Sequence, residues 1–305
     1  MKRAVLLLAH GTPESAQQVP AYLQYVTSGR PMPAEVVAEI QHRYAQIGRS
    51  PLTDITRDQA AALARMLDIA VYFGMRNWHP FIAPAVEQML VDGITDAIVI
   101  CLAPQNSRTS VGLYRKALVA AAAEKLQLDF VEDWHAQPRL IAAFAEKLRA
   151  SRQHDEKVIF TAHSVPCRTI LSGQAGLSGE QAGDPYGRQA RETAALVAEQ
   201  VGLVEADWVF AFQSQGVSGG PWIGPTVEET IDALAREGVR ATLVQPIGFV
   251  CDHVEVLYDI DIAFKQFAAA RGVTLTRTES LNTSPRLIAA LANIVRSRVR
   301  EHVTA

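Results

Sequence analysis

Two histidine-bearing turns and one carboxylate-rich segment carry the residue types best suited to chemistry in this chain. His163 follows the apolar run Val158–Ala162 and lies on a turn closed by Pro166. A neutral imidazole at the end of a strand can bind a metal ion or accept a proton near pH 7. A histidine there can equally serve only to complete its turn, and the residue type alone does not separate the two roles.

The carboxylates follow Gln245–Val250, which ends another predicted strand. We expect Asp252 to cap the next helix, with Glu255 as its capping-box partner. On that helix Glu255 and Asp259 share a face, whereas His253 and Glu255 diverge by about 200°. Carboxylates on one face repel one another unless solvent or cations bind them. The spacing fits a path for a metal ion, and it fits a helix cap with solvated neighbours equally well.

Further candidates are a histidine and two tryptophans. His10 follows the first predicted strand and either lines a cleft opposite His163 or completes its own turn. Trp78 and Trp222 lie on loop-like segments, where a single tryptophan is more often a packing residue than a ligand platform. Several aromatic residues around one cleft would suit a flat aromatic ligand.

Cysteine usage bears on metal sites and on compartment. The chain has three cysteines, Cys101, Cys167 and Cys251, with no short-range pairing. A zinc or iron–sulfur site needs more ligands than this set supplies. An odd number of scattered cysteines also argues against a disulfide framework and favours a reducing cytoplasm.

Short apolar runs alternate with longer Ala-, Leu- and Glu-rich segments. The predicted strands are Ala4–Ala9, Ile69–Phe73, Ala97–Leu102, Leu128–Glu132, Lys157–Thr161, Trp208–Phe212, Ala241–Gln245 and Val273–Thr276, and the predicted helices include Asp58–Leu67, Gly112–Leu126, Gln189–Val201 and Val227–Glu237. Apolar strands separated by helices indicate buried parallel strands, and hence a doubly wound α/β fold.

The order of features repeats along the chain. The first strand ends in Ala9-His10-Gly11-Thr12-Pro13, the fifth ends in Ala162-His163-Ser164-Val165-Pro166, and each is followed by three more strand–helix units. We interpret this as two similar halves, 1–138 and 139–283, although two unrelated turns could converge on this form. Ligands of such sheets bind at the carboxyl ends of the strands, so one cleft between the halves is expected. The Gly/Ser-rich stretch Ser172–Gly183 is interpreted as a mobile loop bordering it.

Composition excludes several classes of function. The chain has 305 residues, is 49% hydrophobic and has a net charge of −3, so it offers no broad cationic field for nucleic acid. No apolar run reaches the roughly 18 residues of a membrane-spanning helix, and the N-terminal apolar run is too short for a signal peptide. GxGxxG, GxxxxGK[ST] and GxSxG are all missing from the sequence, which argues against common nucleotide-binding and hydrolase folds. We expect a soluble, cytoplasmic protein that is at most loosely peripheral to a membrane.

Ordered motifs along nearly the whole chain resemble those of the ferrochelatases. They are HGTP at 10–13, SGRPMP at 28–33, SPLTDIT at 50–56, YFGMRNWHPFI at 72–82, TAHSVP at 161–166, GDPY at 183–186, FQSQG at 212–216, PWIGPT at 221–226 and GFVCDHVEVLYDID at 248–261. The resemblance implies a chelatase-like fold of two Rossmann-like domains with a porphyrin cleft between them. It also implies that a C-terminal helix at about 284–302 returns to the first domain.

The resemblance implies roles for matched residues. His163 is similar to the family's active-site histidine, and Glu255 to a carboxylate facing it across the macrocycle. Asp259 is similar to an acidic residue on a track that leads cations to the site, so these three residues form the implied metal set. The implied porphyrin cleft is lined by His10, Arg30, Ser50 and Trp222.

The implied reaction is insertion of ferrous iron into a porphyrin, with iron as a substrate and no tightly bound cofactor. The macrocycle must be bent and must lose its two pyrrole protons. A histidine and a carboxylate on opposite faces could divide proton removal and metal delivery between them. The residues alone do not say which group does which. Insertion of cobalt or nickel into a related tetrapyrrole, and a non-catalytic tetrapyrrole carrier, are the alternatives. A carrier has no need of a base facing a carboxylate.

Departures from the family pattern bear on the substrate. HGTP is similar to the YGTP of coproporphyrin-type enzymes, but His10 replaces the tyrosine often found there. No cysteine-bearing tail and no apolar lip are evident, so neither an iron–sulfur cluster nor a membrane anchor is expected. We therefore expect a monomer that prefers coproporphyrin III to protoporphyrin IX, with Arg30 available to pair with a propionate.

Overall fold

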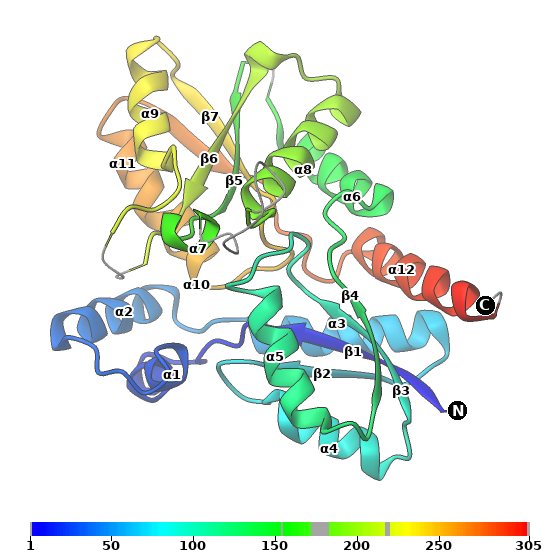
Figure 1. Ribbon diagram of the computed structural model, residues 1–305. Coiled ribbons are helices and arrows are strands. Elements are labelled where there is room, and N and C mark those ends of the chain that lie inside the picture. The colour runs from blue at the N-terminus through cyan, green and yellow to red at the C-terminus, as the bar shows by residue number, and fades with distance from the viewer. Residues whose placement is uncertain (1, 154, 172–182, 217–219, 304–305) are drawn as a thin grey trace.

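Eight parallel strands form two separate four-stranded sheets (Figure 1). The computed structural model describes residues 2–153, 155–171, 183–216 and 220–303. The first sheet has the order β2 (Val71–Met75), β1 (Arg3–Ala9), β3 (Asp96–Cys101), β4 (Gln127–Val131), and the second has β6 (Trp208–Gln213), β5 (Lys157–His163), β7 (Ala241–Pro246), β8 (Thr274–Arg277). All eight predicted strands are confirmed at nearly the predicted bounds. The predicted loop Ser172–Gly183 lies outside the described residues except for Gly183.

The two sheets share one topology. In each, the first strand in sequence is flanked by the second and third, and the fourth lies beyond the third. The chain therefore reverses its direction of winding at β1 and at β5, and ligands of open α/β sheets bind at such switch points. His10 comes directly after β1, and His163 is the last residue of β5. The doubly wound α/β class predicted from the sequence is confirmed.

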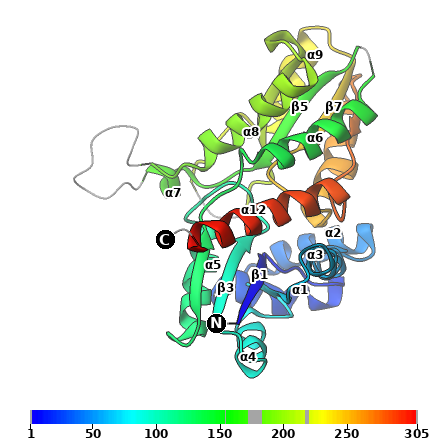
Figure 2. The same ribbon diagram turned by 90° about the vertical axis from the view of Figure 1, so that its right-hand side faces the viewer.

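Helices cover both sheets (Figures 1 and 2). They are α1 (Val19–Val26), α2 (Ala34–Ile47), α3 (Leu52–Leu67), α4 (Ile82–Val91), α5 (Val111–Ala122), α6 (Pro138–Ser151), α7 (Cys167–Leu171), α8 (Tyr186–Val201), α9 (Val227–Arg236), α10 (Val254–Leu257), α11 (Lys265–Ala269) and α12 (Pro285–Val303). Short 3₁₀ helices span Ala16–Gln18 and Glu205–Asp207, and a π-helix, η4, spans Asp259–Phe264. The four predicted helices and the C-terminal helix are all present.

The core follows from the period of the strands. In β1, Val5 and Leu7 enter one apolar cluster while Leu6 and Leu8 enter another, because successive side chains point to opposite faces of a sheet. The cluster of Val5 continues into the second half through α6 and α12. There Leu287, in α12, belongs to the same buried set. The two halves therefore share one continuous core.

The C-terminal helix joins the halves. α12 packs against α3 of the first half and α6 of the second, and Figure 2 shows it lying between them. Its buried residues Leu287, Ile288, Leu291 and Val295 recur at helical spacing, which gives one apolar face. This arrangement fixes the spacing of the two sheets, and hence of the residues at their carboxyl ends.

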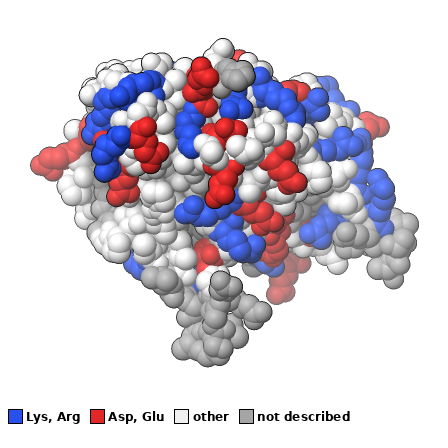
Figure 3. Space-filling model, turned by 90° about the horizontal axis from the view of Figure 1, so that it is seen from above, with Lys and Arg blue, Asp and Glu red and all other residues white. Residues whose placement is uncertain are grey.

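The surface is mixed in charge. On the face seen in Figure 3, Lys and Arg side chains are interspersed with Asp and Glu. A mixed surface of this kind offers no extended cationic field for a polyanion. Within the described ranges, no helix is long and apolar enough to cross a membrane.

Candidate active site

His163 lies at the carboxyl end of β5, with about a third of its side chain exposed. Its Nδ1 lies 3.2 Å from the carbonyl oxygen of Gln213, the last residue of neighbouring β6. A carbonyl can only accept, so Nδ1 carries the hydrogen and the lone pair of the neutral ring is on Nε2. Tyr186 donates its hydroxyl hydrogen to the His163 carbonyl at 2.9 Å. The backbone and the ring of His163 are therefore both fixed.

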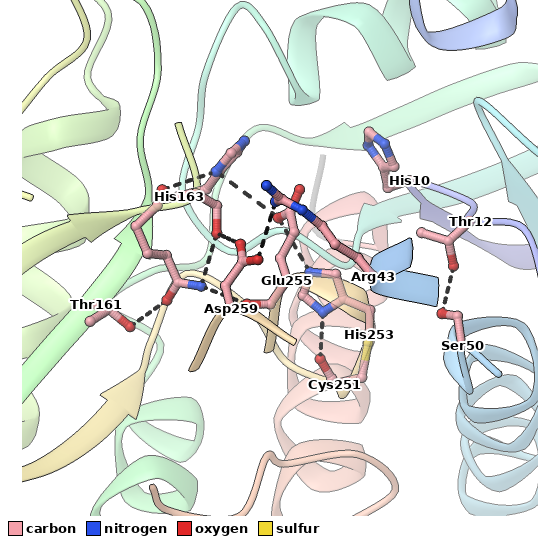
Figure 4. Close-up of polar contacts among 12 residues, drawn as sticks. His10, Thr12, Arg43, Ser50, Thr161, His163, Cys251, His253, Glu255 and Asp259 are labelled. Carbon is pink, nitrogen blue, oxygen red and sulfur yellow. Dashed lines mark hydrogen bonds and ion pairs between the residues drawn. The ribbon is translucent and has the colours of Figure 1, made fainter. Parts of the chain in front are cut away.

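Glu255 reaches His163 from α10 (Figure 4). Its Oε2 lies 4.0 Å from His163 Nδ1. A macrocycle between the two groups would need van der Waals contact of about 3.5–4.0 Å on each face, which this distance does not allow. The expectation that they face each other across the porphyrin is therefore wrong, and both lie on the same side, at the end of the second sheet.

The close approach of β7 to β5 helps to bring these groups together. A Cβ added to Gly248 would lie 2.9 Å from the Cα and Cβ of Ala162, the residue before His163. The backbone after β7 can come this close to β5 because glycine has no side chain. Gly248 thereby starts the segment that carries Glu255 directly beside the end of β5.

Asp252 does not cap the helix. His253 is the N-cap residue, in an extended conformation, with no side-chain cap hydrogen bond. The Asp252 carboxylate instead accepts hydrogen bonds from Arg277, Ser280 and Asn282. The predicted capping box is therefore wrong, because these tertiary donors take the carboxylate that the cap would have used.

His253 also lies closer to Glu255 than predicted. Its Nε2 is 3.5 Å from Glu255 Oε2, and its Nδ1 is 3.2 Å from the Cys251 carbonyl oxygen. The predicted divergence of 200° assumed helical backbone at both positions, whereas His253 precedes the helix with φ −162° and ψ −177°. His253 is a site residue that sequence reasoning missed.

The electrostatics of Glu255 favour the carboxylate. Burial alone would raise its pKa, but the imidazoles of His163 and His253, which attract the carboxylate when they are protonated, and the hydrogen bond of His253 outweigh that effect. The pKa of Glu255 is therefore held well below its usual range. An ionised carboxylate at this position attracts a cation and can accept a proton.

Asp259 lies at the start of the π-helix and is buried. Its carboxylate accepts a hydrogen bond from Ser214, and Arg43 Nη1 of the first half lies 3.4 Å from its Oδ1. Burial raises the pKa of Asp259 to about 6, against the hydrogen bond of Ser214, and the negative charge of Glu255 acts in the same direction as burial. Asp259 is therefore held between two partners, one from each half.

The Gln213 side chain forms hydrogen bonds with several elements around His163 and Glu255. Its Nε2 donates to the carbonyl oxygen of Glu255 at 3.0 Å and to Ser214 Oγ at 3.3 Å, and its Oε1 accepts from Thr161 at 2.6 Å. One buried side chain thus joins β5, β6 and α10. The motif FQSQG contains this residue, but residue type and spacing do not distinguish it from its neighbours.

His10 comes from the first half, apart from the cluster formed by His163 and Glu255 (Figure 4). Its Nε2 lies 3.0 Å from the hydroxyl of Tyr22 and 3.1 Å from Nδ2 of Asn77. His10 is exposed to solvent at the end of β1, yet desolvation by the protein packed around it lowers its pKa to about 4, opposed by Glu255. His10 is therefore a neutral imidazole beside Tyr22, whose ring packs edge-on against Trp78.

The remaining predicted cleft residues lie in three different settings. Trp222 forms an isolated bridge with Pro166, and its ring centroid is 6.4 Å from that of His163. The buried Ser50 shares a hydrogen bond of 2.8 Å with Thr12. Arg30 is exposed on the loop after α1, where its Nε donates to the Thr27 carbonyl. Trp222 thus lies beside His163, while Ser50 links the turn after β1 to the start of α3.

Metal ligands are not preassembled. Among the residues that the structure describes, no group of three or more His, Cys, Asp or Glu side chains is arranged to hold a metal ion. His163 and Glu255 are nevertheless a nitrogen–oxygen pair, each about a third exposed, of the kind that binds divalent ions.

Solved structures share this fold. SirB from Bacillus subtilis with Fe³⁺ superposes with a TM-score of 0.57 at 14% identity, covering 97% of this chain and 95% of that chain. CbiX, described as the terminal enzyme of siroheme biosynthesis in denitrifying bacteria, gives a TM-score of 0.52 over 97% of this chain and 99% of that chain. Two parallel sheets with this topology define the chelatase fold.

Sequence comparison identifies the family within the chelatase fold. The family model "Ferrochelatase" matches residues 2–299. A ferrochelatase of Acidobacterium capsulatum is 54% identical, covering 97% of this chain and 94% of the relative. A coproporphyrin III ferrochelatase of Oceanobacillus iheyensis is 34% identical, covering 99% of this chain and 98% of the relative. The chain belongs to the ferrochelatase family, whose members are metal chelatases of heme biosynthesis.

Proposed function

We propose that this ferrochelatase inserts ferrous iron into coproporphyrin III, with His163 and Glu255 acting on one face of the macrocycle and His10 lying at the other. The observation that carries this proposal is the 4.0 Å approach of Glu255 Oε2 to His163 Nδ1 at the switch point of the second sheet. This approach supports the proposal because a base and an anionic metal ligand so close together could serve the same pyrrole nitrogens.

The two groups differ in what they can do. His163 directs its Nδ1 hydrogen to the Gln213 carbonyl, so Nε2 is available to accept a pyrrole proton. The ionised Glu255 attracts the incoming cation. Iron insertion releases two pyrrole protons in total, which His163 can take one at a time and pass to solvent through its exposed face. We therefore assign proton removal to His163 and metal delivery to Glu255.

Two observations support coproporphyrin III as the substrate. Relatives named coproporphyrin III ferrochelatase, from Oceanobacillus iheyensis and Geobacillus kaustophilus, are 34% and 36% identical over nearly the whole chain. Arg30 is exposed on the loop between α1 and α2 of the first half. Coproporphyrin carries four propionates and protoporphyrin two, so cationic groups at the rim favour the former.

An anaerobic assay tests this preference. We expect kcat/KM for coproporphyrin III to exceed that for protoporphyrin IX by about tenfold or more, since one charge-assisted contact contributes about 1.5–3 kcal/mol. Arg30→Ala should raise KM for coproporphyrin, whereas Arg57→Ala, which breaks an exposed ion pair with Asp54, should not. A tenfold preference for protoporphyrin would refute the substrate and leave the chelatase activity untouched. Coproporphyrin preference with an inert Arg30→Ala would remove only this anchor.

Asp259 is proposed to lie on the path by which iron reaches Glu255. A divalent cation about 8 Å from a carboxylate is attracted by roughly 1 kcal/mol even at the dielectric constant of water. We therefore expect Asp259→Asn to raise KM for ferrous iron about fivefold and to leave KM for the porphyrin unchanged.

The control is Glu39→Gln, which removes the other carboxylate bound by Arg43, at 3.0 Å, on the exposed face of α2. Iron titrations at saturating porphyrin compare the two variants. An unchanged iron KM in Asp259→Asn would show that Asp259 only pairs with Ser214 and Arg43.

A further inference from the structure

Arg277 ends β8, and its side chain is 12% exposed. Nε and Nη2 donate to the two carboxylate oxygens of Asp261 at 3.0 and 2.8 Å, and Nη1 lies 3.3 Å from Oδ1 of Asp252. The first pair is the forked geometry in which a guanidinium binds a carboxylate most strongly. One guanidinium therefore binds two carboxylates that are nine residues apart in sequence.

These two carboxylates bracket the catalytic segment. Asp252 precedes α10, and Asp261 lies inside the π-helix η4. Between them lie Glu255, 4.0 Å from His163, His253, 3.5 Å from Glu255, and Asp259, which accepts a hydrogen bond from Ser214. The guanidinium ties one end of this segment to the other.

The segment is helical but irregular. α10 has four residues, η4 six and α11 five, and they follow one another with helical backbone at Tyr258 and Phe264. π-helical turns such as η4 are rare and less favourable than regular α-helix. The orientation of Glu255 therefore depends on contacts from other elements.

The loop after β8 completes this support. Ser280 Oγ and Asn282 Nδ2 donate to the two oxygens of Asp252 at 2.7 and 2.8 Å. Asn282 Oδ1 accepts from the backbone N–H of Asp252 at 2.8 Å, and its own N–H donates to the Val250 carbonyl at 2.9 Å. Asp252 is thus fixed through both carboxylate oxygens and its backbone.

We propose that Arg277 is a positioning residue for metal insertion: by binding Asp252 and Asp261 together it sets the orientation of the segment between them. It touches neither His163 nor Glu255, so its effect on the reaction passes through the placement of the Glu255 carboxylate. The inference rests on the role proposed above for Glu255.

The test compares three variants by anaerobic steady-state kinetics. Arg277→Lys keeps the charge that the two carboxylates need, but one ammonium cannot reproduce the fork and the second contact. Misplacement of a reacting group by about 1 Å can cost about 100-fold, so we expect kcat to fall about 10- to 100-fold in Arg277→Lys and Arg277→Gln. The dissociation constant and KM for coproporphyrin should change by less than about threefold.

Arg271→Gln is the matched control. Arg271 forms an ion pair with Asp232 in the same half and contacts no residue of the catalytic segment. We expect its kcat to equal that of the unmodified protein. If Arg277→Gln fails to fold, Arg277→Lys and Asp261→Asn provide the comparison.

A second background separates positioning from a general structural role. In Glu255→Gln protein there is no carboxylate left to orient, so adding Arg277→Lys should lower the residual rate by less than about twofold. An equal loss in both backgrounds, or a normal kcat in Arg277→Lys beside an inactive Glu255→Gln, would overturn the role of Arg277 alone. Normal turnover in Glu255→Gln would overturn the proposed function of Glu255 itself.

Discussion

His163→Ala is expected to lower the rate of iron insertion about 100- to 10,000-fold, the usual loss when a positioned acid–base group is removed. The Gln213 carbonyl accepts from Nδ1 of the imidazole, which leaves Nε2 available as a base. Porphyrin affinity should change by less than about threefold, because under the proposed function most contacts with the macrocycle come from other residues. Single-turnover metallation and porphyrin binding, both measured anaerobically, give the two quantities.

Chemical rescue separates a base from a packing residue. A third of the His163 side chain is exposed, so the space left in His163→Ala opens to solvent. We expect added imidazole to restore part of the metallation rate in this variant and to leave the unmodified protein unchanged. Near-normal turnover in His163→Ala would refute its role as the base. A slow variant that imidazole cannot rescue, with weakened porphyrin binding, would make it a structural residue.

The fold was largely predictable because its strands are buried on both faces. β1 and β3 are continuous apolar runs in which nearly every side chain is buried. Such runs stand out from the amphipathic helices between them. The order of strands in each sheet was not predictable, since any parallel order would have buried the same residues. That order is what places His163 beside the segment after β7.

The candidate residues could be selected from the sequence, but their arrangement could not. His163 lies at the end of β5 and Glu255 in a helix that follows β7, as expected. The side from which Glu255 approaches His163 depends on Gly248, whose lack of a side chain lets the chain after β7 come into contact with Ala162. No spacing in the sequence records that approach.

The helix cap predicted from local sequence is absent because tertiary contacts compete for the same carboxylate. Asp252 has the residue type and spacing of a helix cap, but Arg277 at the end of β8 and Ser280 and Asn282 in the loop after it provide competing partners. His253 then takes the N-cap position in extended backbone and lies near Glu255. Helix-capping propensity gives way here because three tertiary donors bind the partly buried carboxylate.

Glu255→Gln is expected to lower kcat for iron insertion by at least about 100-fold, because glutamine keeps the shape of the side chain but removes the charge that receives the metal. The neighbouring imidazoles of His163 and His253 now lower the pKa of Glu255 and favour its ionised form. In the variant they face a neutral amide, which offers a divalent cation a far weaker ligand. Glu255→Asp keeps the charge but withdraws it by one methylene, so we expect its kcat to lie between those of the unmodified protein and Glu255→Gln.

Comparison with Asp259→Asn distinguishes a ligand that receives the metal from a residue on the path of the metal. Loss of a residue on the path should be overcome by more iron, whereas loss of the receiving ligand should persist at saturating iron. Iron titrations of both variants, with coproporphyrin saturating, therefore give a changed KM for Asp259→Asn and a changed kcat for Glu255→Gln. If His163 and Glu255 act on the same proton and metal exchange, the double variant should be little slower than the worse single variant. Fully additive losses, or a Glu255→Gln defect that excess iron abolishes, would show that Glu255 attracts iron without receiving it.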